Sequence, residues 1–312
     1  MLAAGILLGW FTASFQAEAE SDKGFIRYAE FNVPYDALRT AMRADIESEG
    51  AVDWVDALAW LSAKYGGEWK RYKADDLAAV LEKLAGGEQP EGLQYYDYFH
   101  EVYDCVLSGF LGVNLVEVAD GEWVCEYGLR AFSPLAAGYW YNDFDDFGVS
   151  RSYGFARTHM GHDLMGGIGT PVVAVESGTV EAMGWNQYGG WRIGIRSDDG
   201  RRYWYYAHLR QDHPFVPTLA EGCHVTAGDV IGYLGRTGYS HNENVNGIET
   251  PHLHYGLELI FDESQKESNN EIWVDLYAIT RLLRDHPSEV VRVENDYERA
   301  RNFLLCGEGA AR

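Results

Sequence analysis

The sequence predicts an α+β fold in which an N-terminal helical domain and C-terminal helices flank an antiparallel, β-rich domain. Between residues 25 and 111, apolar residues recur at three- to four-residue spacing, which is typical of packed helices. From residue 154 to 259, short β-branched and aromatic runs alternate with turn residues, which indicates a sandwich or barrel-like sheet. The 35 glycines among 312 residues gather mainly between residues 138 and 256 and support a turn-rich middle region.

An apolar run opens the chain at residues 1–15 and is followed by Ala17-Glu18-Ala19, which has the small-x-small form of a signal-peptidase site. We therefore expect residues 1–20 to be a signal peptide or, second, a short membrane anchor that retains the protein at the membrane. A buried N-terminal helix is the third alternative. No Lys or Arg precedes Lys23, so the positive segment usual in a leader is missing. Export is the favoured interpretation.

The helical domain over residues 25–111 is expected to contain four helices. Their predicted bounds are Tyr35 to Ile46, Val55 to Tyr65, Asp75 to Leu84 and Tyr95 to Leu107. Its many aromatic side chains could line a ligand groove, but core packing is their commoner use. The sequence assigns this domain no function.

A Gly- and Pro-containing connector is expected over residues 112–150, and it ends in the acidic and aromatic stretch 139–147. Metal binding by the Asp residues of that stretch is one interpretation, and an exposed loop is the preferred one. The β-rich domain is expected over residues 151–262, with a C-terminal segment of helices over 263–312. The expected strands are 171–175, 179–183, 192–196, 202–208, 230–234 and 252–258, and the C-terminal helices are 273–284 and 297–305.

Composition excludes a basic nucleic-acid binder as the default interpretation. The chain has 25 Lys and Arg against 48 Asp and Glu, a net charge of −23, and repels a polyphosphate. A mean hydropathy of −0.29 describes a globular rather than a polytopic membrane chain. The four cysteines, Cys105, Cys125, Cys223 and Cys306, form no C-x-x-C pair, so a Cys-based zinc site is not indicated. They could form up to two disulfides or remain free thiols.

Three His-bearing segments of the β-rich domain indicate chemistry. His252 and His254 are two residues apart in a predicted strand, so both side chains leave by the same face. Upstream, His159 and Asp163 form an H-x-G-x-D motif, and His208 ends an aromatic strand. Two imidazoles with one carboxylate form a ligand set for catalytic zinc, which keeps its fourth position for water.

In this order the segments resemble the LytM/lysostaphin-type zinc metallopeptidases, the M23 family of peptidoglycan endopeptidases. The matching motifs are H-x-G-x-D at 159–163, Y-A-H-L at 206–209, the glycine-rich run 228–238 and P-H-L-H-Y at 251–255. The resemblance covers about residues 154–259 and neither of the flanking helical segments. The link 239–250 is longer than the family's usual one, which affects the shape of the cleft.

The resemblance implies that His159, Asp163 and His254 bind one Zn²⁺. It implies that His252 acts as general base on the water that zinc binds, and that His208 orients or polarises the reacting group. His162 is expected to face away from the site as a structural residue, and His213, His224 and His241 to face solvent. Trp185 to Tyr188 lie where the family walls its substrate cleft.

The leading functional hypothesis is an exported, extracytoplasmic zinc endopeptidase that hydrolyses stem peptides or cross-bridges of peptidoglycan. One alternative is a non-catalytic relative that binds cell wall or activates a partner hydrolase. Another is an enzyme that its own helical domain holds inactive. All five motif residues are present in this chain, which favours the enzyme. The negative charge argues against electrostatic attraction to an anionic wall.

Overall fold

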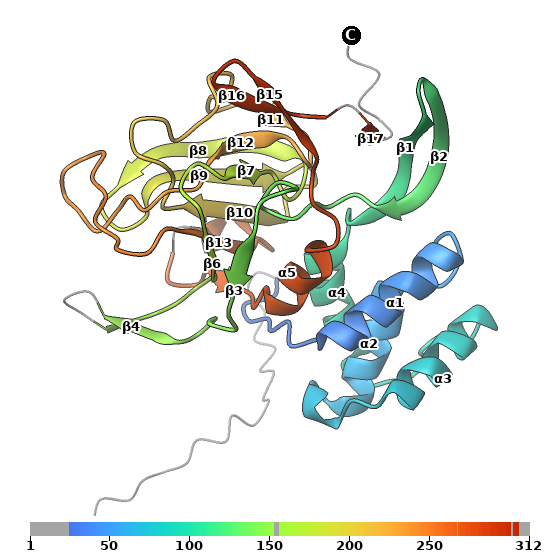
Figure 1. Ribbon diagram of the computed structural model, residues 1–312. Coiled ribbons are helices and arrows are strands. Elements are labelled where there is room, and N and C mark those ends of the chain that lie inside the picture. Colours follow the sequence, from blue (N-terminus) through green and yellow to red (C-terminus); the bar gives the residue numbers. More distant parts are fainter. Residues whose placement is uncertain (1–24, 153–155, 267, 301, 306–312) are drawn as a thin grey trace, which may run out of the picture.

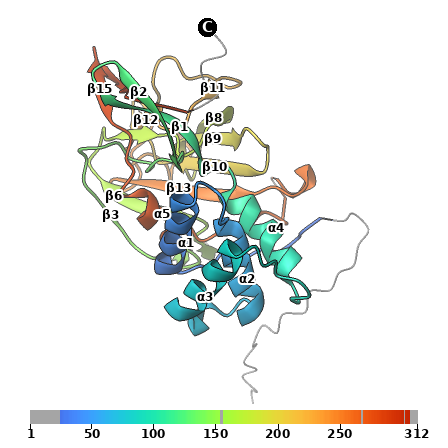
Figure 2. The same ribbon diagram turned by 90° about the vertical axis from the view of Figure 1, so that its right-hand side faces the viewer.

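The computed structural model describes residues 25–152, 156–266, 268–300 and 302–305. Figures 1 and 2 show helices α1 to α4 gathered beside a β-rich body, an α+β arrangement that confirms the predicted fold class. The expected leader at residues 1–20 lies outside the described residues. Within the described ranges, no helix combines the length and apolar character that a membrane crossing requires.

The four N-terminal helices form where the apolar periodicity predicts them. They are α1 (Tyr35–Glu47), α2 (Trp54–Tyr65), α3 (Ala74–Ala85) and α4 (Tyr96–Leu107). At the start of α2, the Asp53 carboxylate accepts a hydrogen bond from the Val55 amide at 2.6 Å. Gly66 ends α2 in a left-handed conformation with φ of 62°. Five aromatic residues of this domain, Trp54, Tyr65, Trp69, Phe99 and Tyr103, are buried in its core.

The segment expected as a connector begins with a β-hairpin. Strands β1 (Leu111–Ala119) and β2 (Glu122–Leu129) pair around Asp120 and Gly121, and β17 (Phe303–Leu305) adds to the other edge of β1. A second hairpin joins β15 (Val290–Val293) to β16 (Asp296–Arg299). The predicted helix at 297–305 is therefore wrong, because its residues complete β-ladders with β15 and β1. The other C-terminal helix exists as α5 (Tyr277–Leu283), shorter than expected.

The largest sheet is open and has the strand order β11-β8-β9-β10-β13-β6-β3, with β14 pairing additionally with β13. Its strands are β3 (Tyr141–Asp143), β6 (His162–Gly166), β8 (Gly178–Asn186), β9 (Gly190–Ser197), β10 (Arg202–Ala207), β11 (His224–Val225), β13 (His252–Leu259) and β14 (Ile272–Trp273). Two smaller pairs are β7 (Pro171–Val173) with β12 (Val230–Tyr233) and β4 (Ser150–Ser152) with β5 (Ala156–Thr158). None of these described sheets closes into a barrel.

The helical domain packs on the sheet face that points away from the histidines. Phe110, which follows α4, stacks on Trp204 of β10 with ring centroids 6.3 Å apart. The buried Arg202 guanidinium pairs with Glu176 at 2.7 Å and donates to the Cys105 carbonyl at 2.8 Å. One hydrophobic core runs from the helices into the sheet, so the helices support the sheet from behind.

The three described cysteines, Cys105, Cys125 and Cys223, are free thiols. Cys306 lies outside the described residues. A disulfide among the three described cysteines is therefore excluded.

Candidate functional site

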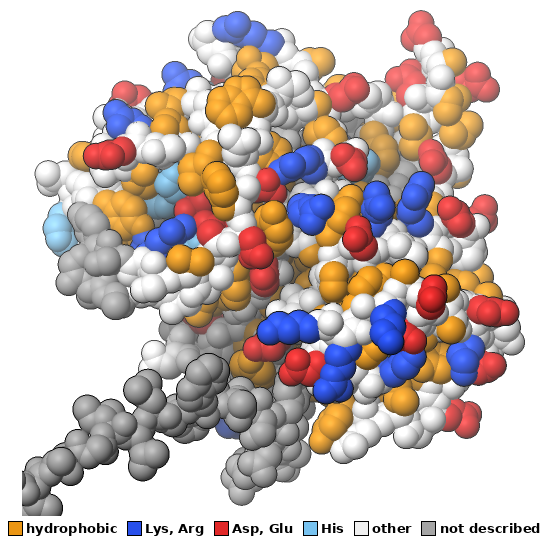
Figure 3. Space-filling model, turned by 60° about the horizontal axis from the view of Figure 1, so that its bottom comes forward, with side chains coloured by type: hydrophobic (Ala, Val, Ile, Leu, Met, Phe, Trp, Pro, Cys, Tyr) orange, Lys and Arg blue, Asp and Glu red, His pale blue; other side chains and the backbone are white. Residues whose placement is uncertain are grey.

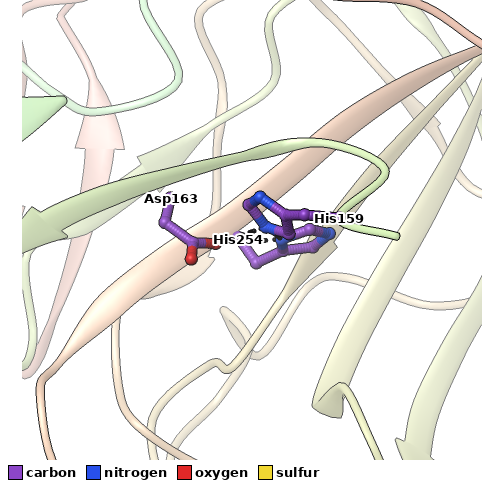
Figure 4. Close-up of side chains that lie close together, drawn as sticks. All are labelled: His159, Asp163 and His254. Carbon is purple, nitrogen blue, oxygen red and sulfur yellow. Dashed lines mark hydrogen bonds and ion pairs between the residues drawn. The ribbon is translucent and has the colours of Figure 1, made fainter. Parts of the chain in front are cut away.

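His159, Asp163 and His254 converge on one point at the open face of the sheet (Figure 4). His159 Nε2 lies 3.1 Å from Asp163 Oδ1 and 3.0 Å from His254 Nδ1. His254 Nδ1 lies 3.0 Å from the same Asp163 oxygen. The structure therefore brings together the three residues that the family resemblance implies as metal ligands.

The pairing of β6 with β13 sets this geometry. His254 stands directly opposite Asp163 in the antiparallel ladder, so their side chains leave the same face. Gly161 turns the chain between His159 and Asp163, so that the His159 ring lies against the side chains of Asp163 and His254. Its φ is 154°, and a Cβ there would lie 2.6 Å from the Tyr255 carbonyl oxygen and 2.8 Å from the His254 ring. Only glycine allows this close approach.

The donor set fits zinc. The spacing of 3.0–3.1 Å among the three atoms is close to the roughly 3.3 Å that separates ligands about 2.0–2.1 Å from a tetrahedral zinc. Burial would raise the pKa of Asp163, but hydrogen bonds with His159 and His254 hold it well below its usual range. The carboxylate is therefore ionised and available to a cation. Burial lowers the pKa of His254, which favours the neutral ring that a metal requires.

Two further imidazoles, those of His208 and His252, stand beside this cluster. Their ring centroids are 4.8 Å apart, and His252 Nε2 lies 3.7 Å from Asp163 Oδ1. His208 Nδ1 donates to the Thr237 carbonyl at 2.9 Å, and His252 Nδ1 donates to the Thr250 carbonyl at 2.8 Å. Because a carbonyl only accepts, Nδ1 of each ring carries a hydrogen, and in the neutral form of each ring Nε2 keeps the lone pair. Burial and the neighbouring His252 lower the pKa of His208 well below its usual value.

Asp146 is a site residue that the sequence did not single out. Its backbone carbonyl accepts a hydrogen bond from His159 Nδ1 at 2.9 Å, and its carboxylate lies 3.3 Å from the same nitrogen. These contacts leave His159 Nε2 as the atom that faces Asp163. Burial would lower the pKa of His159, but hydrogen bonds to Asp146 and Asp163 raise it to about 9. The only sequence signal for Asp146 was its place in the acidic stretch 139–147.

His162 lies behind the cluster on the opposite face of β6, as expected. Its ring is buried between two carboxylates, with Nδ1 3.2 Å from Asp146 and Nε2 3.0 Å from Asp275. Asp146 therefore links the rings of His159 and His162. Arg151 completes the arrangement, with its guanidinium 2.8 Å from Asp146 and 3.4 Å from Asp163.

These side chains open into a cleft of about 750 Å³, and histidines are visible at the surface of the same face in Figure 3. Its described lining comes only from residues between 151 and 273. Helices α1 to α4 contribute none of the described lining, which gives no support to occlusion of the cleft by the helical domain. Asn186 and Tyr188 line it, as expected for the loop 185–188, and Tyr239 of the long link 239–250 lines it as well.

Three further histidines of the β-rich domain lie away from the cluster. His224 and His241 are exposed, as expected. His213 is only half-exposed, because its ring stacks on Tyr233 and its Nε2 lies 2.7 Å from Asp296.

Comparison with known proteins agrees with this geometry. A model of peptidase family M23 matches residues 157–269. An L-Ala–D-Glu endopeptidase of Bacillus subtilis (strain 168) is 40% identical over 133 residues, which cover 42% of this chain and 39% of that protein. Lysostaphin of Staphylococcus staphylolyticus is 34% identical over 136 residues, which cover 41% of this chain and 25% of that protein. The chain thus spans less than half the length of these curated relatives.

One solved structure resembles most of the chain. It is a LytM protein of Ruminococcus gnavus, with a TM-score of 0.60, 24% identity, and coverage of 84% of this chain and 91% of that one. This likeness concerns the fold. The local sequence match, the fold and the convergent His-Asp-His cluster agree, and residues 157–269 of this chain match peptidase family M23 and fit its LytM/lysostaphin type.

Proposed function

We propose that this protein is a zinc-dependent endopeptidase that hydrolyses peptide bonds in peptidoglycan stem peptides or cross-bridges outside the cytoplasm. The observation that carries the proposal is the meeting of three ligand atoms 3.0–3.1 Å apart with the rings of His208 and His252 beside them. A non-catalytic wall-binding protein would have no need of both the ligand set and the two additional rings. The names of the B. subtilis and staphylococcal relatives support the peptidoglycan substrate.

Each residue has a role in this proposal. His159, Asp163 and His254 hold the metal, and Asp163 also offsets part of its charge. Zinc bound there would lower the pKa of water to about 7 and polarise the scissile carbonyl. His252, whose Nε2 lies 3.7 Å from Asp163 Oδ1, takes the proton of the attacking water and returns it to the leaving amine. His208 orients the reacting carbonyl from the same side.

The test combines metal analysis with digestion of purified peptidoglycan. We expect one zinc per chain, and released muropeptides that carry new amino termini in mass spectra. A chelator should remove the bound zinc and stop the release of muropeptides, and both should return when zinc is added back. Stoichiometric zinc without cleavage would contradict the endopeptidase and favour a non-catalytic, partner-activating role, and absence of zinc after metal loading would contradict the whole proposal.

Asp146→Asn is expected to weaken zinc binding by about 10- to 100-fold, because the carboxylate behind a ligating histidine orients the ring and raises its basicity. The measurement is competition with a chromophoric chelator, which reports affinity independently of activity. Asp145→Asn is the matched control, because Asp145 is the exposed neighbour of the buried Asp146. Equal zinc affinities of the two variants would show that Asp146 only supports the fold.

A further inference from the structure

The metal end of the cleft is basic, although the whole chain carries a net charge of −23. Arg151, Arg157 and Arg192 all line the cleft near the His-Asp-His cluster. Basic side chains are also visible near the histidines in Figure 3. The cleft can therefore attract a negatively charged group even though the protein as a whole is acidic.

Arg192 is placed by the strand register. Ile193 pairs with Tyr206, so the adjacent residue Arg192 lies beside Ala207. Ala207 in turn pairs with His254, and His254 pairs with Asp163. Arg192 therefore shares a cross-strand row with two of the proposed metal ligands, two strands or about 10 Å from His254. In this row, Ala207 is the residue that lies between Arg192 and His254 on the floor of the cleft.

Arg157 lines the same cleft from strand β5. It pairs with Arg151 across the β4–β5 hairpin, and its guanidinium lies 5.0 Å from the centre of the Tyr239 ring. Burial raises the pKa of Tyr205 on the floor, whereas the charges of Arg192 and Arg157 oppose the increase. Both guanidinium groups are thus close enough to act on the same floor residue.

The three arginines differ in their partners. Arg151 is engaged by Asp146 and Asp163. Within the described residues, neither Arg157 nor Arg192 has a carboxylate at ion-pair distance, and the Nε atom of each is buried without a hydrogen-bond partner. An unsatisfied, buried N–H of a charged group is costly, and a carboxylate satisfies it with charge-assisted, bidentate hydrogen bonds.

Apart from Asp163 of the His-Asp-His cluster, the acidic side chains that line the cleft are Glu258 and Glu271. Glu258 is opposite Tyr203 in the ladder, four residues beyond His254 along β13, and burial raises its pKa to about 7. Glu271 accepts a hydrogen bond from the Trp273 indole at 2.8 Å. Neither acidic group therefore neutralises the arginines at the metal end. A neutral, glycine-rich peptide would leave both Arg157 and Arg192 without partners.

We propose that Arg192 and Arg157 form a subsite that binds a free carboxylate of the substrate peptide. The inference rests on the proposed function and narrows its substrate to acidic stem peptides rather than neutral cross-bridges. An extended peptide advances about 3.3 Å per residue, so the bound carboxylate belongs to a residue within about three positions of the scissile bond. The L-Ala–D-Glu bond in the name of the B. subtilis relative has an acidic residue at this distance.

The test compares two synthetic peptides of sequence L-Ala–γ-D-Glu–L-Lys–D-Ala with an amidated C-terminus. One keeps the α-carboxylate of D-Glu free, and the other carries a carboxamide there. For the zinc-loaded protein we expect kcat/KM to be at least tenfold higher for the free acid, and its dissociation constant to be lower by a similar factor. Arg192→Gln and Arg157→Gln should each reduce the preference several-fold, and the double variant should bring it close to unity.

The control is Arg43→Gln, which removes a charge from the exposed face of α1 and should retain the preference. Arg192→Lys keeps the charge without the bidentate fork and should restore part of the preference, which separates a binding role from a folding defect. Circular dichroism and zinc content identify any variant that is misfolded.

The outcomes separate the subsite from the proposed function. If wild-type protein digests peptidoglycan but binds and cleaves the two peptides equally, or if the arginine variants retain the preference, the subsite is wrong and the endopeptidase stands. If the zinc-loaded protein cleaves neither peptide nor peptidoglycan, the endopeptidase fails. The subsite is then tested by binding alone: calorimetry should still give a lower dissociation constant for the free-acid peptide than for the carboxamide, and equal constants would contradict the subsite.

Discussion

Alanine in place of His159, Asp163 or His254 is expected to remove bound zinc and peptidase activity together. Each residue supplies one of three atoms that lie 3.0–3.1 Å apart, and two ligands cannot replace the set of three. Loss of the metal removes several kcal/mol of transition-state stabilisation, so kcat/KM should fall about a thousandfold or more. Zinc content by elemental analysis and peptide cleavage are measured on the same samples.

Two controls test this assignment. His224→Ala removes an exposed imidazole of the same domain, which lies 2.9 Å from Asp198, and should change neither zinc nor rate. Added zinc should rescue chelator-treated wild-type protein but none of the three variants. Loss of zinc from His252→Ala together with its retention by His254→Ala would show that the ligands were assigned to the wrong histidines.

Local alternation accounts for the part of the site that the sequence predicted. His252 and His254 point to the cleft while Leu253 between them is fully buried, because successive side chains of a strand leave by opposite faces. The glycine of the H-x-G-x-D motif permits the turn between His159 and Asp163, as its φ of 154° shows. Short-range rules of this kind depend only on neighbouring residues and are visible in a single sequence.

Asp146 could not be found in that way. It belongs to a stretch without periodicity, for which the sequence predicts an exposed loop, yet it is buried and contacts both His159 and His162. Its position depends on how the chain before β4 packs against β6, a long-range contact that propensity does not encode. The β1–β2 hairpin differs in this respect, because the Asp120-Gly121 pair between alternating strands was an available hairpin signal.

The same distinction applies to charge. The net charge of −23 predicts that the protein does not attract an anionic polymer as a whole. The fold nevertheless places Arg157 and Arg192 together at one end of the cleft, although they are far apart in the sequence. Composition therefore describes long-range behaviour, whereas specificity depends on a few side chains that the sheet register brings together.

Substitution of His208 or His252 is expected to leave zinc in place and to lower kcat by about 10²- to 10⁴-fold, the usual contribution of a positioned acid or base. Both rings are fixed by Nδ1 hydrogen bonds to backbone carbonyls, and neither occupies a position in the ligand triangle. His252→Ala removes the proposed base. His252 lies in strand β13 and is not among the residues with positive φ, so alanine fits the backbone there without strain. His208 has a φ of 61°, so Asn, which tolerates the left-handed region, is the better replacement there.

The readout that distinguishes these residues from ligands is the ratio of zinc content to rate. Full zinc occupancy with a reduced kcat and a nearly unchanged KM would assign His208 and His252 to the chemical step. A reduced occupancy would instead make them part of the metal site, and an unchanged kcat would remove them from the mechanism. Because the Nε2 lone pairs of both rings face the cleft only while Nδ1 donates to Thr237 and Thr250, we expect the first result.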